Sequence, residues 1–179
     1  MQKLIIVCGL PGTGKTELAN ELSKELSISV LHKDCIKEAL YEIQNLSTLE
    51  ESRIIGLHSM LLLYRLTEKQ LDNGLDIIIE APFNVLEGYK LFRKWERKYN
   101  NLHIFSIICE IDEKERRRRC TNRERHAAHH DNERGFEGRT KSKAYKKLPG
   151  KIIKVRTDRP VTKLVSEIST SYFKYKTKR

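Results

Sequence analysis

A phosphate-binding pattern near the start of the chain limits its possible folds. The pattern G-x-x-x-x-G-K-[ST] is met by Gly9-Leu10-Pro11-Gly12-Thr13-Gly14-Lys15-Thr16. Residues 4–8 before it are apolar and mostly β-branched, which predicts a buried strand, and leucines at positions 18, 22 and 26 predict a helix after it. A strand, a glycine-rich loop and a helix in this order predict an anion site at the helix N-terminus.

Each part of this loop suits the chemistry of a nucleoside triphosphate. Glycines allow backbone N–H groups to converge on phosphates, and the helix dipole favours their negative charge. Lys15 can reach the terminal phosphates, and the hydroxyl of Thr16 can ligate Mg²⁺. We therefore predict ATP and Mg²⁺ as ligands of residues 9–16, with Lys15 as a catalytic residue.

The rest of the 179 residues alternates between short apolar runs and amphipathic stretches. This alternation predicts an α/β fold: a five-stranded parallel sheet with helices on both faces, in a single domain spanning residues 1–179. The other predicted strands are 28–31, 77–80, 103–111 and 152–156, and the other helices are 35–43, 50–73, 86–99, 114–125 and 161–173. Helix 50–73 has apolar residues at helical spacing, namely Ile54, Leu57, Leu61, Leu62, Leu66 and Leu71.

The positive charge is concentrated in one part of the sequence. The net charge is +11, and residues 114–159 contain 17 Lys and Arg against 6 Asp and Glu, so this segment carries the whole excess. Such a segment fits phosphate handling, contact with a polyanion, or a solvated surface. Within it, residues 125–150 are polar and irregular, which is typical of lids or disordered segments.

The composition also bears on where the protein is found. No stretch approaches the ~18 consecutive apolar residues of a membrane span. The four cysteines are far apart, and two of them lie in apolar runs, which is typical of buried thiols in a reducing compartment. We therefore predict a cytoplasmic protein without a membrane partner.

Two carboxylates follow predicted strands, at the edge where open α/β sheets bind ligands. Asp34 follows the second strand, where it can accept a proton from an attacking hydroxyl or, alternatively, cap a helix. Glu80 ends the third strand, where it can hold Mg²⁺ directly or through water, face the substrate, or be an exposed charge. Asn84 follows shortly after and is a candidate for lining the acceptor site.

Residues 116–119 are four consecutive arginines, which cannot share one face of a helix. Arg119 and Arg123 are four residues apart, so we predict that they share a face of helix 114–125. Two fork-shaped donors on one face suit the charge that develops on a transferring phosphate. Arg117 and Arg118 are predicted to be solvated.

A histidine cluster follows the arginines. His126 and His130 have the i, i+4 spacing of a helical metal pair, with Asp131 as a candidate third ligand. The alternatives are a role for these residues at the substrate or in closing a lid, and an ordinary polar loop.

The phosphate loop, the order of the strands and the basic flank resemble the small AAA-type P-loop kinases. This family includes polynucleotide 5′-hydroxyl kinases, zeta toxins, chloramphenicol phosphotransferases and gluconate kinases. The resemblance spans nearly the whole chain. It implies a nucleoside-monophosphate-kinase-like fold and a mobile basic lid, at about residues 124–150 after the fourth strand, that carries arginines such as Arg119 and Arg123 to the phosphates.

The resemblance also implies roles for single residues. It favours the catalytic role for Asp34, since these kinases carry an acid at that position, and makes Lys37 a substrate or phosphate contact. It implies an acceptor-side role for His126, and it places the turn containing Asp158 against the adenine. Aspartate is commoner than glutamate at the position of Glu80, which leaves a water-mediated or substrate-facing role open.

These observations predict an ATP-dependent phosphotransferase that moves the γ-phosphoryl group to a hydroxyl of a small-molecule or nucleotide-like acceptor. The basic segment favours an anionic acceptor. Aromatic residues are not interleaved with the arginines, which disfavours stacking on single-stranded nucleic acid. The alternatives are a nucleic-acid-binding ATPase or nucleotide switch, and a 5′-hydroxyl polynucleotide kinase.

Overall fold

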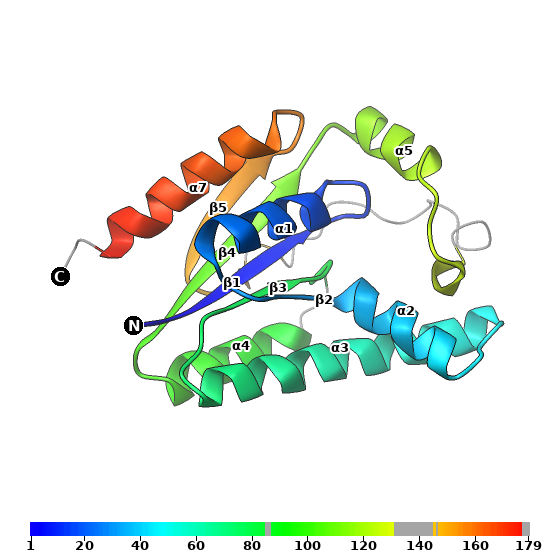
Figure 1. The fold of residues 1–179 in the computed structure, drawn as a ribbon, viewed down its shortest axis with the longest axis horizontal. Helices are drawn as coiled ribbons and strands as arrows, with labels where there is room; N and C mark the ends of the chain where they lie inside the picture. Colours follow the sequence, from blue (N-terminus) through cyan, green and yellow to red (C-terminus); the bar gives the residue numbers. More distant parts are fainter. Residues whose placement is uncertain (85–86, 131–144, 146, 177–179) are drawn as a thin grey trace.

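The computed structural model describes residues 1–84, 87–130, 145 and 147–176. Strands and helices alternate along the chain (Figure 1). The strands are β1 (Gln2–Gly9), β2 (Val30–His32), β3 (Ile77–Glu80), β4 (Leu102–Glu110) and β5 (Lys151–Arg156). The helices are α1 (Lys15–Leu26), α2 (Lys33–Ile43), α3 (Leu49–Asp72), α4 (Glu87–Lys98), α5 (Glu113–Thr121), the 3₁₀ turn η1 (Ala127–His129) and α7 (Val161–Lys176).

The five strands form one sheet in the order β2-β3-β1-β4-β5, and every neighbouring pair is parallel. β1 therefore lies at the centre, between β3 and β4. Its alternate side chains pack on opposite faces, as the two-residue period of a strand requires. Leu4, Ile6 and Cys8 join the core under α3 and α4, whereas Ile5 and Val7 join the core under α1 and α7.

This architecture confirms the predicted α/β fold with helices on both faces of a parallel sheet. The element that differs most from its prediction is α5, the helix with four consecutive arginines, which was predicted to reach Arg125 but ends at Thr121. Cys120, Thr121 and Asn122 are weak helix formers, and the Thr121 hydroxyl donates to the Arg117 carbonyl oxygen at 3.1 Å. Arg119 and Arg123 therefore do not share a helical face, and that prediction is wrong.

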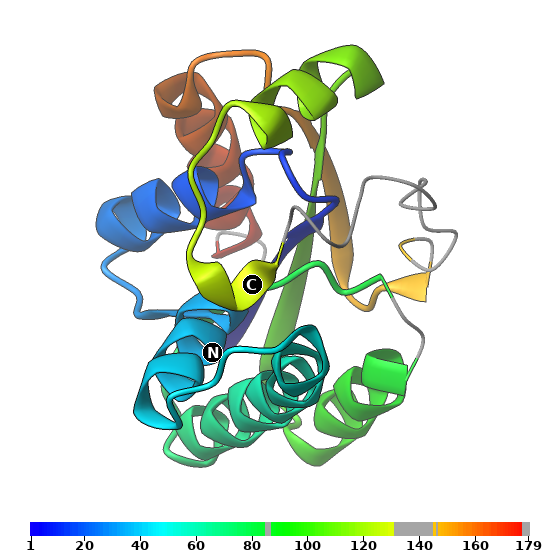
Figure 2. The same ribbon diagram turned by 90° about the vertical axis from the view of Figure 1, so that its right-hand side faces the viewer.

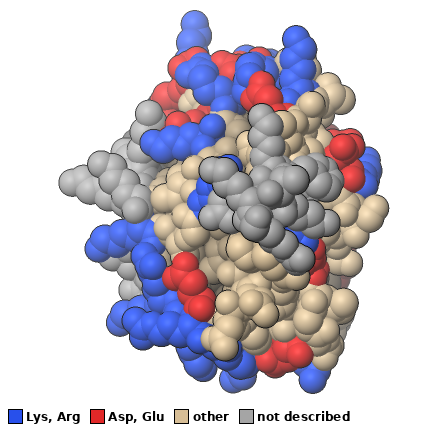
Figure 3. All heavy atoms as spheres, turned by 90° about the vertical axis from the view of Figure 1, so that its left-hand side faces the viewer, with Lys and Arg blue, Asp and Glu red and all other residues tan. Residues whose placement is uncertain are grey.

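The carboxyl ends of the strands gather the loops at one edge of the sheet. Figure 2 looks onto this edge and shows the phosphate loop between β1 and α1, with the segment after α5 crossing toward α2. Most of the predicted basic lid, residues 131–144 and 146, lies outside the described residues. Figure 3 shows the face of the molecule opposite to the one in Figure 2. On it, basic and acidic side chains lie near one another, and wide areas between them consist of uncharged residues. Among the described helices, none is long and apolar enough to cross a membrane.

Candidate active site

The phosphate loop is held tightly against α5. Gly12 has a φ of 81°, and a Cβ at this position would lie 2.5 Å from Cys120 Sγ and 2.7 Å from the carbonyl oxygen of Arg116. The Arg116 side chain is buried here and donates to the carbonyl oxygen of Pro11 at 3.2 Å. Glycine at position 12 thus allows both the left-handed backbone and the close approach of α5.

Lys15, Thr16 and Glu80 meet at the start of α1. Lys15 Nζ lies 3.7 Å from Glu80 Oε1, and the Thr16 hydroxyl donates to Glu80 Oε2 at 3.3 Å. His32 Nδ1 lies 3.0 Å from the same carboxylate, because β2 pairs with β3 in a register that sets His32 opposite Glu80. Thr16 and Glu80, the two residues predicted as Mg²⁺ ligands, thus lie together, and a histidine that was not predicted lies beside them.

Two hollows flank the phosphate loop. The first, which we call the α5 hollow, has a volume of about 520 Å³ and lies between the loop, α5 and the start of α7. Arg119 borders it and donates to the carbonyl oxygen of Thr157 at 3.1 Å. Thr157, Arg159 and Pro160 line it, whereas Asp158 is exposed and pairs with Arg156. The predicted nucleotide turn is therefore at this hollow, although Asp158 itself is not among the lining residues.

The second hollow, the α2 hollow, has a volume of about 270 Å³ and lies between the loop and the start of α2. It brings together residues that are far apart in the sequence and that were predicted to form the site: Lys15, Thr16, Asp34, Lys37, Asn84 and Arg123. Arg123 also lines the α5 hollow, so its side chain borders both hollows. Lys33, Arg125 and His129 line the α2 hollow as well and were not predicted.

Asp34 lies in a strongly cationic environment. Arg125 donates to Asp34 Oδ2 at 3.0 Å, and Lys33 donates to Oδ1 at 3.2 Å. Burial opposes ionisation, but the cations Lys33 and Arg125 outweigh it and lower the pKa of Asp34 to about 2. Asp34 is in the first turn of α2 rather than at its N-cap, which is His32. The helix-cap alternative for Asp34 is therefore excluded.

Lys37 lines the α2 hollow, and its ammonium group is also bound within the protein. Its side chain is buried, and its ammonium donates to Ser52 Oγ at 2.7 Å and to the carbonyl oxygen of Ala128 at 2.6 Å. Ser52 Oγ also donates to that carbonyl, at 2.6 Å. Lys37 thus borders the α2 hollow, and its hydrogen bonds to Ser52 and Ala128 fasten η1 to α2 and α3.

The histidine cluster docks η1 in the same way. His129 is buried, with Nε2 2.7 Å from Glu38 Oε1 and Nδ1 2.9 Å from the Arg125 guanidinium. Because the guanidinium can only donate, Nδ1 accepts and Nε2–H donates to Glu38, as in a neutral imidazole. Burial lowers the pKa of His129, which agrees with this state.

His126 and His130 lie against α2. His126 Nε2 is 3.1 Å from Glu42, and the rings of both histidines meet the Tyr41 ring edge-on. Asp131 lies outside the described residues. Among the residues that are described, no three His, Cys, Asp or Glu side chains gather closely enough to hold a metal ion.

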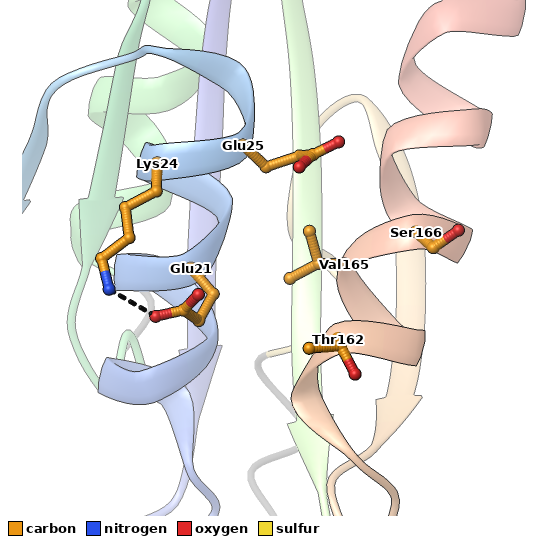
Figure 4. A pocket seen from close by; sticks show the side chains of 6 residues that line it. All are labelled: Glu21, Lys24, Glu25, Thr162, Val165 and Ser166. Atoms are coloured by element: carbon orange, nitrogen blue, oxygen red, sulfur yellow. Dashed lines mark hydrogen bonds and ion pairs between the residues drawn. The ribbon is translucent and has the colours of Figure 1, made fainter.

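A third hollow lies between α1 and α7, at a distance from the phosphate loop along α1. Glu21, Lys24 and Glu25 line it from α1, opposite Thr162, Val165 and Ser166 of α7 (Figure 4). The cation that lines it, Lys24, pairs with Glu21 at 2.6 Å. This hollow has two carboxylates and lacks the convergent cations of the other two, so we place the candidate site at the phosphate loop.

The fold and the loop define a protein with the architecture of a small P-loop kinase. A putative kinase from Chloroflexus aurantiacus J-10-fl has 22% sequence identity and a TM-score of 0.75, and the match covers 97% of each chain. The APS kinase CysC of Mycobacterium tuberculosis, solved with AMPPNP and APS, has 15% identity and a TM-score of 0.58 over 94% of this chain and 95% of that one. Shikimate kinase from Aquifex aeolicus has 19% identity and a TM-score of 0.57 over 99% and 100%.

The family of the chain follows from its sequence. The model of the AAA domain family matches residues 4–138, which is more than half of the chain. The chain belongs to this family. No curated protein matches it in sequence. The matched residues include the phosphate loop, Asp34, Glu80 and both predicted arginines, so the family model covers the α2 hollow but not the turn after β5 that lines the α5 hollow.

Proposed function

We propose that this protein is an ATP-dependent kinase that transfers the γ-phosphoryl group to a hydroxyl of a small, anionic acceptor. The observation that carries the proposal is the pair of hollows on either side of one phosphate loop, with Arg123 lining both. A phosphoryl group must pass from a donor to an acceptor across such a loop, and catalysis depends mainly on positioning and charge.

The α5 hollow suits the nucleoside part of ATP. Gly12 and Gly14 open onto it from the loop, and Thr157 and Pro160 line it from the turn after β5. The phosphates would then follow the loop toward Lys15, whose ammonium is already within the loop, 3.4 Å from the Leu10 carbonyl oxygen. We expect Arg119, which lines this hollow, to contact the phosphates.

Thr16 and Glu80 fit the requirements of Mg²⁺. They offer a hydroxyl and a carboxylate oxygen within 3.3 Å of each other, and Mg²⁺ prefers oxygen ligands and retains waters and phosphate oxygens besides protein groups. When bound, the ion would neutralise charge on the phosphates. The requirement for Mg²⁺ is part of this proposal.

Asp34 is the candidate residue for the acceptor hydroxyl. With a pKa lowered to about 2, it is ionised at neutral pH and can accept a hydrogen bond from the hydroxyl. A carboxylate with so low a pKa is a weak base, so we expect it to orient the hydroxyl first and to take its proton late in the transfer.

The composition of the α2 hollow favours a small acceptor that carries negative charge. Among the described residues, four cationic side chains besides Lys37, namely Lys15, Lys33, Arg123 and Arg125, line it with a single carboxylate, Asp34. Phosphate, carboxylate or sulfate groups suit such an excess of positive charge. The volume of about 270 Å³ suits a molecule of the size of a sugar or hydroxy acid.

The test is transfer of label from [γ-³²P]ATP by the full chain with Mg²⁺. Acceptor pools would contain hydroxy acids, sugar acids, nucleosides, nucleotides and a 5′-hydroxyl oligonucleotide. We expect label in one small anionic pool, and a loss of about 10²–10³-fold or more in Lys15→Met and Asp34→Asn. Lys24→Met, in the hollow of Figure 4, is the matched control and should keep full activity.

Two results would redirect the proposal. Full acceptor-dependent transfer by Asp34→Asn would remove this residue from the mechanism. Hydrolysis of ATP that is stimulated by polynucleotide, without label in any acceptor, would favour the nucleic-acid-binding ATPase.

A further inference from the structure

The longest helix, α3, turns apolar side chains toward solvent. Nine large apolar side chains are exposed among the described residues, and five of them lie on this helix: Ile54, Leu57, Leu61, Leu62 and Leu66. Leu57 and Leu61 are the most open of the five, at 69% and 61% exposed. In both ribbon views α3 lies along the lower surface of the molecule (Figures 1 and 2).

The buried face of α3 is unusually polar. Half of its buried residues carry hydroxyl groups, namely Ser52, Ser59 and Thr67. Ser59 and Thr67 satisfy their hydroxyls by donating to carbonyl oxygens of the helix itself, at 2.9 and 2.7 Å. A surface helix of a monomer normally places its leucines inward and its polar residues outward. In α3, hydroxyl-bearing residues lie on the inner face and several leucines lie on the outer face, which indicates that the outer face has a partner.

We propose that α3 is the contact helix of a homodimer, in which two copies pack antiparallel across a two-fold axis. Cyclic dimers are the commonest oligomers, and a two-fold contact uses one patch on both copies. A second copy offers the matching apolar side chains. With the axis near residue 59, Leu57 of one copy would face Leu61 of the other, since these two residues are four apart and share a face of α3.

The charges at the ends of α3 favour the antiparallel arrangement. Glu50 lies in its first turn and Lys69 in its last turn, and both are exposed. Antiparallel packing would place Glu50 of each copy beside Lys69 of the other. Parallel packing would instead set like charges side by side, which is unfavourable.

The size of the patch also fits a contact between two copies. Ile54, Leu57 and Leu61 share one face of α3, and with on the order of 80 Å² each they leave about 240 Å² of it open to water. This is about a third of the ~800 Å² that each partner buries in a standard interface. The polar side chains that flank the patch would supply the remainder, as the rim does in other interfaces.

Sedimentation equilibrium of the full chain tests the proposal without any assay of activity. We expect twice the chain mass of 21.0 kDa for the wild type and a monomer for Leu57→Glu/Leu61→Glu. The matched control is Ile152→Glu, which places the same charge at an exposed apolar side chain of β5 and should remain a dimer. Circular dichroism would verify that each variant is folded, because these side chains contribute little to the monomer core.

A charge exchange tests the antiparallel register. Glu50→Lys and Lys69→Glu should each weaken dimerisation by at least several-fold, and the double variant should recover affinity. A monomeric wild type at submillimolar concentration would overturn the proposal, as would an unchanged dimer in Leu57→Glu/Leu61→Glu. A double variant that is no tighter than either single variant would overturn the antiparallel register.

Discussion

The contact between the phosphate loop and α5 makes a strong prediction about Gly12. In Gly12→Ala the new methyl group must take a left-handed backbone at φ 81° and would meet Cys120 Sγ and the Arg116 carbonyl oxygen at 2.5 and 2.7 Å. The backbone contributes about 1–2 kcal/mol and the overlap, which moves backbone, about 1–3 kcal/mol. We expect the free energy of unfolding to fall by about 2–5 kcal/mol.

Gly74→Ala is the matched control. Gly74 has a similar φ of 75°, but a Cβ there would have no neighbour within 4 Å. This variant carries only the backbone cost of about 1–2 kcal/mol, and the entropy change of the unfolded chain is the same in both. The difference between the two variants, about 1–3 kcal/mol, therefore measures the overlap with α5.

Urea unfolding followed by circular dichroism gives both free energies. Equal destabilisation of Gly12→Ala and Gly74→Ala would refute the tight packing of α5 on the loop. We also expect weaker ATP binding in Gly12→Ala alone, since only this glycine lies in the phosphate loop.

The docking of η1 leads to two further predictions. Lys37→Met and Ser52→Ala should each lower the free energy of unfolding, measured in urea, by about 1–3 kcal/mol. The double variant should lose more than the sum of the two, because only then does the buried Ala128 carbonyl lose both donors. Strict additivity of the two losses would contradict this prediction. Burial lowers the pKa of His129, so protonation favours the unfolded chain, and stability should fall as the pH drops below about 6.5. His129→Gln should show a smaller fall between pH 7 and 5, and an unchanged slope would contradict the buried neutral state.

The parts of the site that could be predicted are those set by local sequence or by the topology of a parallel sheet. The loop, its preceding strand and its following helix are adjacent in the sequence, so their pattern specifies them directly. Asp34 and Glu80 follow β2 and β3, and parallel strands bring their carboxyl ends to one edge. Their convergence near Lys15 therefore follows from the strand order.

The parts that could not be predicted depend on contacts between distant residues. Arg125 is 91 residues from Asp34, and nothing in its neighbourhood in the sequence indicates that pair. Helical spacing likewise identifies the apolar stripe of α3 but not which face turns inward. That choice depends on hydroxyls such as Ser52, which become buried because Lys37 and Ala128 provide their hydrogen bonds.

The most direct test of the proposed phosphotransfer is the fate of the γ-phosphoryl group of ATP, followed by phosphorus NMR. The full chain would be incubated with ATP, Mg²⁺ and the pools of small anionic hydroxyl compounds. We predict a new phosphomonoester signal that grows with ADP and is lost in Asp34→Asn. ADP that forms with inorganic phosphate alone, at the same rate with and without the acceptor pools, would contradict the account.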